Sequence, residues 1–249
     1  MPEMPEVQGL VDFLGERTSG LAVERLELAS FSVLKTFDPP PQALEGAPID
    51  GVRRHGKYID IDCDGTHLVI HLARAGWIRW SDELPRTVLR PGKSPIALRV
   101  RLVDGSGFDV TEAGTKKSLA AYLVRDVQEI PRLASLGPDP LSDELDREAF
   151  GALLAGRKTQ IKGVLRDQSL IAGVGNAYSD EVLHAARLSP FALASSLTDE
   201  EVDTLHAALR TTLTEAIAAA SGKPAAELKD AKRSGMRVHG RTGEDCPVC

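Results

Sequence analysis

The sequence predicts an α+β protein in which an antiparallel β-sandwich with a flanking helix precedes a helical domain. Three observations predict this fold class. An amphipathic helix opens the chain, apolar and polar side chains alternate in short runs between residues 20 and about 128, and strand patterns vanish beyond residue 141. The 249 residues also exceed a typical single-domain length, which favours two domains or one domain with an appendage.

The first helix is predicted from its apolar spacing. Val7, Leu10, Val11 and Leu14 recur at the period of one helical face, and Gly20 suits the end of the helix. Glu6 would lie in its first turn.

Pro2 has two interpretations. It can simply start the helix, since its fixed φ suits a first turn. If Met1 is removed, Pro2 instead carries a free secondary amine, which can attack a carbonyl carbon to form a cationic iminium, with Glu3 beside it as a proton carrier. These first residues alone leave both interpretations open.

Two hairpins stand out in the sheet region. Alternating runs with the period of a strand are separated by Asp-Gly turns. The runs occupy residues 58–63 and 67–71 around Asp64-Gly65, and residues 96–103 and 108–110 around Asp104-Gly105. Two packed antiparallel layers are therefore expected before residue 130.

A linker is predicted at Pro131 and at Leu-Gly-Pro-Asp-Pro-Leu, residues 136–141. Helical patterns follow at residues 148–154, 160–166, 177–186 and 199–220, the last after a Ser-Leu-Thr-Asp-Glu-Glu capping signal. The predicted domains are an N-terminal β-sandwich domain at residues 1–130, a helical domain at 131–235 and a truncated zinc finger at 236–249.

Gly-Val-Gly-Asn at residues 173–176 separates two of these helices. A tight glycine turn before a helix can present backbone amides to a phosphate. Glycines between helices more often only satisfy local geometry. Both interpretations remain open from the sequence.

Charge is unevenly distributed although the net charge is -6. Residues 157–166 contain four basic side chains and no acidic one, and residues 221–241 contain six basic and two acidic ones, so each segment has a net charge of +4. Such patches are compatible with a phosphate-binding face, although a single charged run is most often a solvated surface.

Composition bounds the class of protein. No stretch is apolar for the length of a membrane span and no signal peptide is present, which predicts a soluble intracellular protein. Three cysteines argue against a disulfide framework, and Cys63 lies in a strand pattern as a buried apolar residue.

Cys246 and Cys249 form a Cys-x2-Cys knuckle, half of a tetrahedral zinc site. Truncation of the finger is the favoured explanation, and a remnant that binds no metal is the alternative.

The motifs together resemble the bacterial formamidopyrimidine-DNA glycosylase and endonuclease VIII group of base-excision repair enzymes. The resemblance covers almost the whole chain. It rests on Pro-Glu-Met-Pro-Glu-Val at 2–7, His-Gly-Lys-Tyr at 55–58, the 136–141 linker, Lys-Thr-Gln-Ile-Lys at 158–162, Gly-Val-Gly-Asn-Ala-Tyr at 173–178 and Gly240-Arg241 ahead of the cysteines. It implies a β-sandwich, a helical domain with a helix–two-turn–helix motif and a zinc finger.

The resemblance also implies function and site residues. Such enzymes are DNA glycosylases with AP lyase activity, in which the Pro2 amine attacks C1′ of the damaged nucleotide and β- and δ-elimination follow. Glu3 shuttles protons, Glu6 helps to shape the site, and Lys57 and Asn176 hold phosphates, with Lys162 near the extruded nucleotide. The catalytic set implied is Pro2, Glu3 and Lys57; the DNA-binding set is Glu6, Arg74, Lys162, Asn176, Tyr178 and Arg241; the zinc ligands are Cys246 and Cys249.

Implied partners are double-stranded DNA with damaged bases or abasic sites, and no membrane. A monomeric, cytoplasmic bacterial protein associated with the nucleoid is expected, with Zn²⁺ bound by the full-length protein.

The chain departs from the formamidopyrimidine branch at three places. Arg74 stands where that branch has a methionine wedge, residues 111–118 lack its Arg and Phe, and the basic segment 221–235 replaces the loop that caps an oxidised purine. Wedge residues compensate lost base stacking, so these changes weaken the expectation of opposite-base reading and 8-oxoguanine excision. Two further hypotheses follow: a protein that binds DNA damage without excision, and a structural RNA-binding protein.

Overall fold

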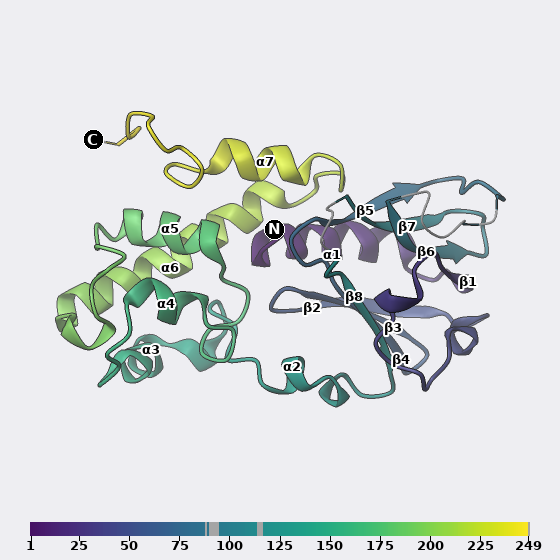
Figure 1. Cartoon of the computed structure of the whole chain (residues 1–249), viewed down its shortest axis with the longest axis horizontal. Coiled ribbons are helices and arrows are strands. Elements are labelled where there is room, and N and C mark those ends of the chain that lie inside the picture. Colours follow the sequence, from purple (N-terminus) through teal and green to yellow (C-terminus); the bar gives the residue numbers. More distant parts are fainter. Residues whose placement is uncertain (88, 90–94, 114–116, 249) are drawn as a thin grey trace. The chain divides into compact units, whose positions relative to one another are not determined.

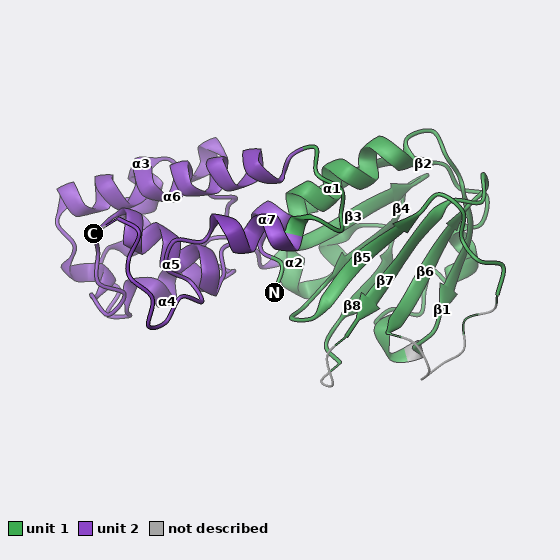
Figure 2. Ribbon diagram, turned by 90° about the horizontal axis from the view of Figure 1, so that it is seen from above, with its two compact units in different colours: residues 1–2, 7–134, 222–228 green, residues 3–6, 135–221, 229–249 purple. Residues whose placement is uncertain are grey.

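A computed structural model of the chain describes residues 1–87, 89, 95–113 and 117–248 (Figure 1). The chain divides into two compact units, coloured separately in Figure 2. The sheet unit comprises residues 1–2, 7–134 and 222–228, and the helical unit comprises residues 3–6, 135–221 and 229–249. One boundary between the two units follows residue 134. Residues 3–6, however, group with helices that are far away in the sequence.

The sheet unit contains two four-stranded antiparallel sheets, as predicted. Their strand orders are β1-β6-β7-β5 and β2-β3-β4-β8. The strands are β1 (Val23–Leu28), β2 (Ile49–His55), β3 (Tyr58–Cys63), β4 (Thr66–His71), β5 (Gly76–Ser81), β6 (Ile96–Leu102), β7 (Gly107–Glu112) and β8 (Ala120–Val124). The predicted hairpins are β3–β4, in which Tyr58 pairs with His71, and β6–β7.

Alternation along these strands places apolar side chains in the core of the sheet unit. Ile59 of β3 and Ile70 of β4 are 0% exposed, and so is Phe108 of β7. Helix α1 (Met4–Thr18) adds its apolar face, in which Leu10 is also fully buried. Cys63 is buried as predicted, and burial with nearby carboxylates raises the pKa of its thiol to about 12. Cys63 therefore behaves as an apolar core residue.

Asp60 departs from the simple alternation pattern. Its polar position in β3 suggests an exposed side chain, yet it is only 1% exposed. Its carboxylate contacts His55 Nε2 at 3.0 Å and His67 Nδ1 at 2.8 Å. Burial opposes ionisation, but these two hydrogen bonds outweigh it and lower the pKa of Asp60. The paired histidines, which lie 12 positions apart on β2 and β4, make burial of the carboxylate tolerable.

The helical unit consists of the predicted helices and one more. They are α3 (Arg147–Leu154), α4 (Ile161–Arg166), α5 (Asn176–Ala185), α6 (Asp199–Ala220) and α7 (Leu228–Gly235). The short α2 (Pro131–Ala134) lies at the end of the 7–134 segment of the sheet unit. Thr198 and Glu201 form the capping box of α6 that the sequence signalled. Helix α7 lies in the basic 221–241 segment, where apolar spacing predicts no helix.

A hydrophobic core packs the helices of the helical unit together. Phe150, Ile161, Val182 and Leu205 are each 0% exposed and pack in one cluster, which also includes Met4 from the N-terminal segment. Among the described residues, no helix is long and apolar enough to cross a membrane.

Candidate active site

Glu3 occupies the N-terminus of α5. Its carboxylate accepts hydrogen bonds from three backbone amides, those of Gly175 at 2.7 Å, Ala177 at 2.9 Å and Tyr178 at 3.3 Å. The side chain is 3% exposed. Unpaired amides and the helix dipole make this terminus a site for an anion. The anion is internal: in this structure these amides hold the Glu3 carboxylate, whereas the sequence left open whether they hold a phosphate.

The two glycines of the turn before α5 are required by the approach of the N-terminal segment. A Cβ on Gly175 would lie 2.5 Å from the Glu3 carboxyl carbon. Gly173 has φ +87, and a Cβ there would lie 2.8 Å from Cβ of Met4. The Met4 amide donates to the Gly173 carbonyl at 3.0 Å. The glycines of the Gly-Val-Gly-Asn motif therefore allow residues 3–6 to pack closely against this turn.

Glu6 holds the backbone of Glu3 in place. Its Oε2 accepts the Glu3 amide at 2.8 Å, and its Oε1 accepts the Tyr178 hydroxyl at 2.6 Å. Burial, followed by the charge of Glu6, raises the pKa of Tyr178 far above its ordinary value. The phenol is therefore protonated near neutral pH and donates its hydrogen bond to Glu6. Glu6 and Tyr178 are each 3% exposed, so their polar groups contact each other in the interior.

Lys232 completes this cluster, and sequence reasoning missed it. Its Nζ lies 2.7 Å from Glu6 Oε2 and 3.9 Å from Glu3 Oε1. It also lies 4.8 Å from the centroid of the Tyr178 ring. The only signal in the sequence was the basic excess of residues 221–241, which does not single out one lysine. We call Glu3, Glu6, Tyr178 and Lys232 the carboxylate cluster.

Pro2 directly precedes this cluster in the chain. Its side chain is buried, and with Met1 attached its nitrogen is part of a peptide bond. The rigidly held Glu3 limits how far the preceding residue can move, because the two share a planar peptide unit.

Lys57 and His71 lie in the sheet unit. Lys57 lies in the turn between β2 and β3 and is 8% exposed. The His71 ring lies 4.6 Å from the Tyr58 ring. Burial, helped by the charges of Lys57 and Arg132, lowers the pKa of His71 to about 4. His71 is therefore neutral near pH 7 and leaves Lys57 and Arg132 as the charges in its neighbourhood.

This lowered pKa predicts a pH dependence of stability. Because folding favours the neutral ring, its contribution is complete above the ordinary value of 6.5 and is lost as the pH falls through about 4. At about 1.4 kcal/mol per pKa unit, this difference corresponds to a loss on the order of 3 kcal/mol. Urea unfolding of the parent and of His71→Asn at several pH values measures it. The parent should lose more stability than the variant over this window; equal losses would contradict the prediction.

The remaining predicted DNA contacts are distributed over both units. Asn176 is exposed at the first position of α5, and Arg74 is exposed between β4 and β5. Lys162 pairs with Asp180 at 2.5 Å. Arg241 donates to the Met236 carbonyl at 2.8 Å and pairs with Glu244 at 3.2 Å. Of the 111–118 stretch that lacks a wedge, residues 114–116 lie outside the described residues.

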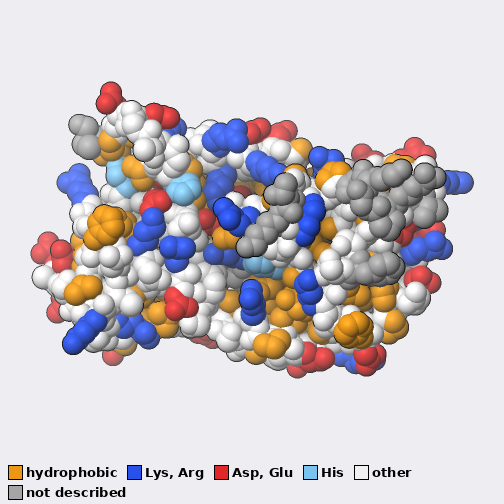
Figure 3. Space-filling view, viewed as in Figure 1, with side chains coloured by type: hydrophobic (Ala, Val, Ile, Leu, Met, Phe, Trp, Pro, Cys, Tyr) orange, Lys and Arg blue, Asp and Glu red, His pale blue; other side chains and the backbone are white. Residues whose placement is uncertain are grey.

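Basic side chains gather near α7 on one face of the molecule. Figure 3 shows Lys and Arg side chains around this helix, which belongs to the segment with net charge +4. A locally positive surface on an acidic protein is the electrostatic footprint expected for a phosphate-rich partner.

The structure places one of the two predicted zinc ligands beside a histidine. Cys246 Sγ lies 3.3 Å from His184 Nε2, and Cys249 lies outside the described residues. In the part of the chain that the structure describes, no group of three or more His, Cys, Asp or Glu side chains is placed to hold a metal ion. These donors fall short of the four that a structural zinc requires, so zinc binding stays a prediction.

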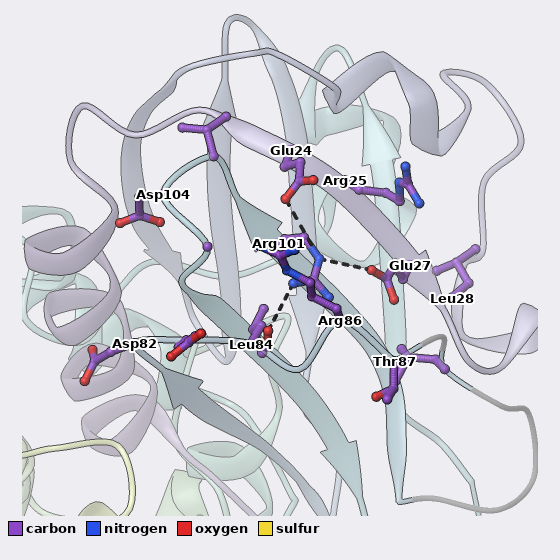
Figure 4. Close-up of a pocket in the computed structure, with 14 residues that line it drawn as sticks. Glu24, Arg25, Glu27, Leu28, Asp82, Leu84, Arg86, Thr87, Arg101 and Asp104 are labelled. Atoms are coloured by element: carbon purple, nitrogen blue, oxygen red, sulfur yellow. Dashed lines mark hydrogen bonds and ion pairs between the residues drawn. The ribbon is translucent and has the colours of Figure 1, made fainter.

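A separate hollow lies in the sheet unit, beside β1 and the segment after β5 (Figure 4). Arg101 points into it and contacts Glu27 at 3.4 Å and the Leu84 carbonyl at 3.4 Å. Glu24 also faces the guanidinium at 3.9 Å. The hollow contains none of the predicted site residues, so we do not assign the chemistry to it.

Two antiparallel sheets followed by a helical unit are the architecture expected of one class of protein, the DNA-repair glycosylases. Comparisons with known proteins agree. Residues 1–121 match the model of the formamidopyrimidine-DNA glycosylase N-terminal domain, and residues 136–226 match that of the formamidopyrimidine-DNA glycosylase H2TH domain. The chain belongs to the formamidopyrimidine-DNA glycosylase family. Its function is that of a DNA-repair glycosylase, and AP lyase activity is a general property of the family.

Individual relatives cover the whole chain. A formamidopyrimidine-DNA glycosylase of Moorella thermoacetica is 34% identical over 100% of this chain and 92% of its own length. The MutM (Fpg) protein of Thermus thermophilus is 30% identical in sequence. Its crystal structure matches with a TM-score of 0.82, over 100% of this chain and 91% of that chain. A Lactococcus lactis enzyme in complex with DNA containing an abasic site is 27% identical, with a TM-score of 0.86 over 99% and 91% of the two chains.

Proposed function

We propose that the free amine of Pro2, exposed by removal of Met1, is the nucleophile that acts on damaged bases and abasic sites in double-stranded DNA. The observation that carries this proposal is the anchoring of Glu3. Three amides hold its carboxylate and Glu6 holds its backbone, so the residue next to Pro2 is fixed inside the protein. A nucleophile needs such a support to meet its target in one geometry. The abasic-site DNA bound by the Lactococcus lactis relative supports the substrate class.

The chemistry follows from the amine. The Pro2 nitrogen forms a bond to C1′ of the nucleotide, and the bond from C1′ to the base breaks, with the base taking the electron pair and a proton. The attached nitrogen then loses its proton and forms a second bond to C1′ while the C1′–O4′ bond breaks, so that O4′ takes an electron pair and a proton and the sugar ring opens. The resulting cationic iminium withdraws electrons from C2′. Loss of a C2′ proton then expels the 3′ phosphate in β-elimination, and a further proton loss expels the 5′ phosphate in δ-elimination. Water releases the sugar fragment from Pro2.

Glu3 is the proton carrier in this scheme. Its carboxylate lies next to the reacting residue, and a side chain placed for proton transfer contributes about 10²–10⁴-fold to a rate. Glu6 and Tyr178 support it: their mutual hydrogen bond and the bond to the Glu3 amide fix the position of the N-terminal segment. Their influence on DNA binding is therefore exerted through Glu3 and Pro2.

Phosphate contacts position the DNA. We assign them to Lys57, Asn176, Lys162 and Arg241, of which Asn176 is exposed at a helix N-terminus. Extruding a nucleotide from the duplex costs a few kcal/mol, least for a damaged pair, and contacts to the backbone offset that cost. Lys162 and Arg241 would exchange their present partners Asp180 and Glu244 for phosphate.

The wedge that fills the space of the extruded base is Arg74 in this proposal. An exposed arginine in the turn between β4 and β5 replaces the apolar side chain of the formamidopyrimidine branch. Because the apolar wedge that compensates lost base stacking is absent, abasic sites and bases that are already unstacked are the preferred substrates over 8-oxoguanine. We also propose that Cys246 and Cys249 bind zinc together with further ligands, and that the protein acts at the bacterial nucleoid.

Borohydride trapping tests the nucleophile. The Met1-free chain is incubated with an abasic-site duplex and borohydride, and the adduct is mapped by mass spectrometry. We expect a covalent adduct on residue 2. A chain with an uncleaved N-terminal extension, in which the Pro2 nitrogen is an amide, is the matched control and should form none.

Three outcomes contradict the proposal in different ways. An adduct on a lysine would place the nucleophile elsewhere. Selective binding to lesion DNA without any adduct would indicate a protein that recognises damage without excision. A preference for structured RNA over lesion DNA would favour the RNA-binding hypothesis.

A further inference from the structure

Helix α7 brings an ammonium group into direct contact with the two buried glutamates. Lys232 Nζ lies 2.7 Å from Glu6 Oε2 and 3.9 Å from Glu3 Oε1, and its side chain is only 17% exposed. The contact joins residues 226 positions apart in the sequence. A lysine that is held away from water between two carboxylates is a specific feature, in contrast to the exposed Lys229 on the same helix.

The ammonium group of Lys232 is surrounded by carboxylates and a phenol. Glu3 and Glu6 are acidic and each has a side chain that is 3% exposed. Tyr178 is neutral because burial and the nearby carboxylates of Glu6, Glu3 and Glu181 raise its pKa. The Glu181 carboxylate accepts the amides of Arg237, Val238 and His239. Lys232 is therefore the cation that the described residues place against the Glu3–Glu6 pair.

The balance between the charges of Glu3, Glu6 and Lys232 affects the protonation of the Pro2 amine, which precedes Glu3 in the chain. An amine attacks carbon only when it is unprotonated. Carboxylates close to an amine favour its protonated form, and a nearby cation opposes that effect. The Glu3 nitrogen, which is 2.8 Å from Glu6 Oε2, belongs to the peptide unit that Pro2 begins. Two uncompensated carboxylates at this point would hold a proton on the Pro2 amine and suppress its reactivity near neutral pH.

We propose that Lys232 is a positioning residue that offsets the charges of Glu3 and Glu6 and thereby keeps the Pro2 amine unprotonated and nucleophilic at neutral pH. This inference rests on the proposed role of Pro2. It assigns to α7, a helix in the segment that replaces a lesion-capping loop, the control of the reactive amine. Lys232 acts through charge and makes no covalent bond in the reaction.

The pH profile of trapping tests the inference. Single-turnover rates of adduct formation with an abasic-site duplex are measured from about pH 6 to about pH 9.5 for the Met1-free parent and for Lys232→Met. We expect the rising limb of Lys232→Met to move to higher pH, with a rate about tenfold lower near pH 7 and close to the parent above about pH 9. Lys232→Arg, which keeps the charge, should have its rising limb at the parent's pH.

Lys229→Met is the matched control. It removes the same charge from the same helix, but its side chain is exposed, and the midpoint of its pH profile should coincide with that of the parent. Thermal unfolding of each variant shows whether it is folded, and Lys232→Arg still tests the inference if Lys232→Met does not fold.

The outcomes separate this inference from the proposed function. A Lys232→Met profile identical to the parent's, or one lowered equally at every pH, would overturn the inference. A displaced Lys232→Arg profile would overturn it as well, because charge would not be the operative property. Absence of an adduct from the parent itself at every pH would overturn the role of Pro2.

Discussion

Replacing Glu3 with glutamine should slow strand cleavage at an abasic site by about 10²–10⁴-fold, the loss expected when a positioned proton carrier is removed. Both Glu3 oxygens are acceptors: Oε1 takes the Ala177 amide at 2.9 Å and Oε2 takes the Gly175 amide at 2.7 Å. Glutamine must turn an NH₂ group toward one of these donors. An unsatisfied buried amide then destabilises the helical unit by about 1–3 kcal/mol.

Single-turnover cleavage assays and urea unfolding measure the two effects separately. Glu16→Gln is the matched control, because Glu16 lies on helix α1, which directly follows Glu3, and its side chain is exposed. It should leave both the cleavage rate and the stability within experimental error of the parent. A Glu3→Gln variant that cleaves within tenfold of the parent would show that the proton is carried by another group.

Replacing Gly175 with alanine should have the second large effect. The added Cβ would lie 2.5 Å from Cδ, 2.7 Å from Oε1 and 2.8 Å from Oε2 of Glu3. The carboxylate must then leave the α5 amides, or α5 must shift. We expect a loss of stability of about 1–3 kcal/mol from overpacking. A displacement near 1 Å at the reacting segment would also slow cleavage by on the order of 10²-fold.

Gly163→Ala provides the control in the same unit. Gly163 lies inside α4, and a Cβ there meets nothing within 4 Å, so alanine should raise stability by up to about 1 kcal/mol. Shortening the facing side chain offers a further check. In the double variant Gly175→Ala with Glu3→Asp, relief of the clash should make the combined loss of stability smaller than the sum of the single losses. Strict additivity would mean that the two residues do not meet.

The parts of the fold that sequence reasoning predicted are those governed by local periodicity. Apolar alternation and Asp-Gly turns predicted the β3–β4 and β6–β7 hairpins, and the Thr198 capping signal located the start of α6. Asp60 shows the limit of such patterns. Its polar character suggests exposure, but histidines on the two neighbouring strands make its burial possible, and strand pairing is not visible in one strand's sequence.

At the candidate site, the sequence likewise indicated several residues but not the contacts that they make. The motifs identified Pro2, Glu3 and Lys57 through a family resemblance, and the family itself is confirmed. The partners of Glu3 were not predictable, because its carboxylate contacts amides about 172 positions away, and backbone amides carry no residue signature. Lys232 was equally hidden among six basic residues of its segment.

The sequence by itself determined the class of the protein, the order of its elements and the residues with the potential for chemistry, because periodicity, turn chemistry and motif order are properties of neighbouring residues. Only the tertiary structure decided what the glycine turn before α5 holds and which cation faces the buried glutamates. Those are contacts between distant segments: they depend on close backbone approach at Gly173 and Gly175 and on the placement of α7 beside Glu6.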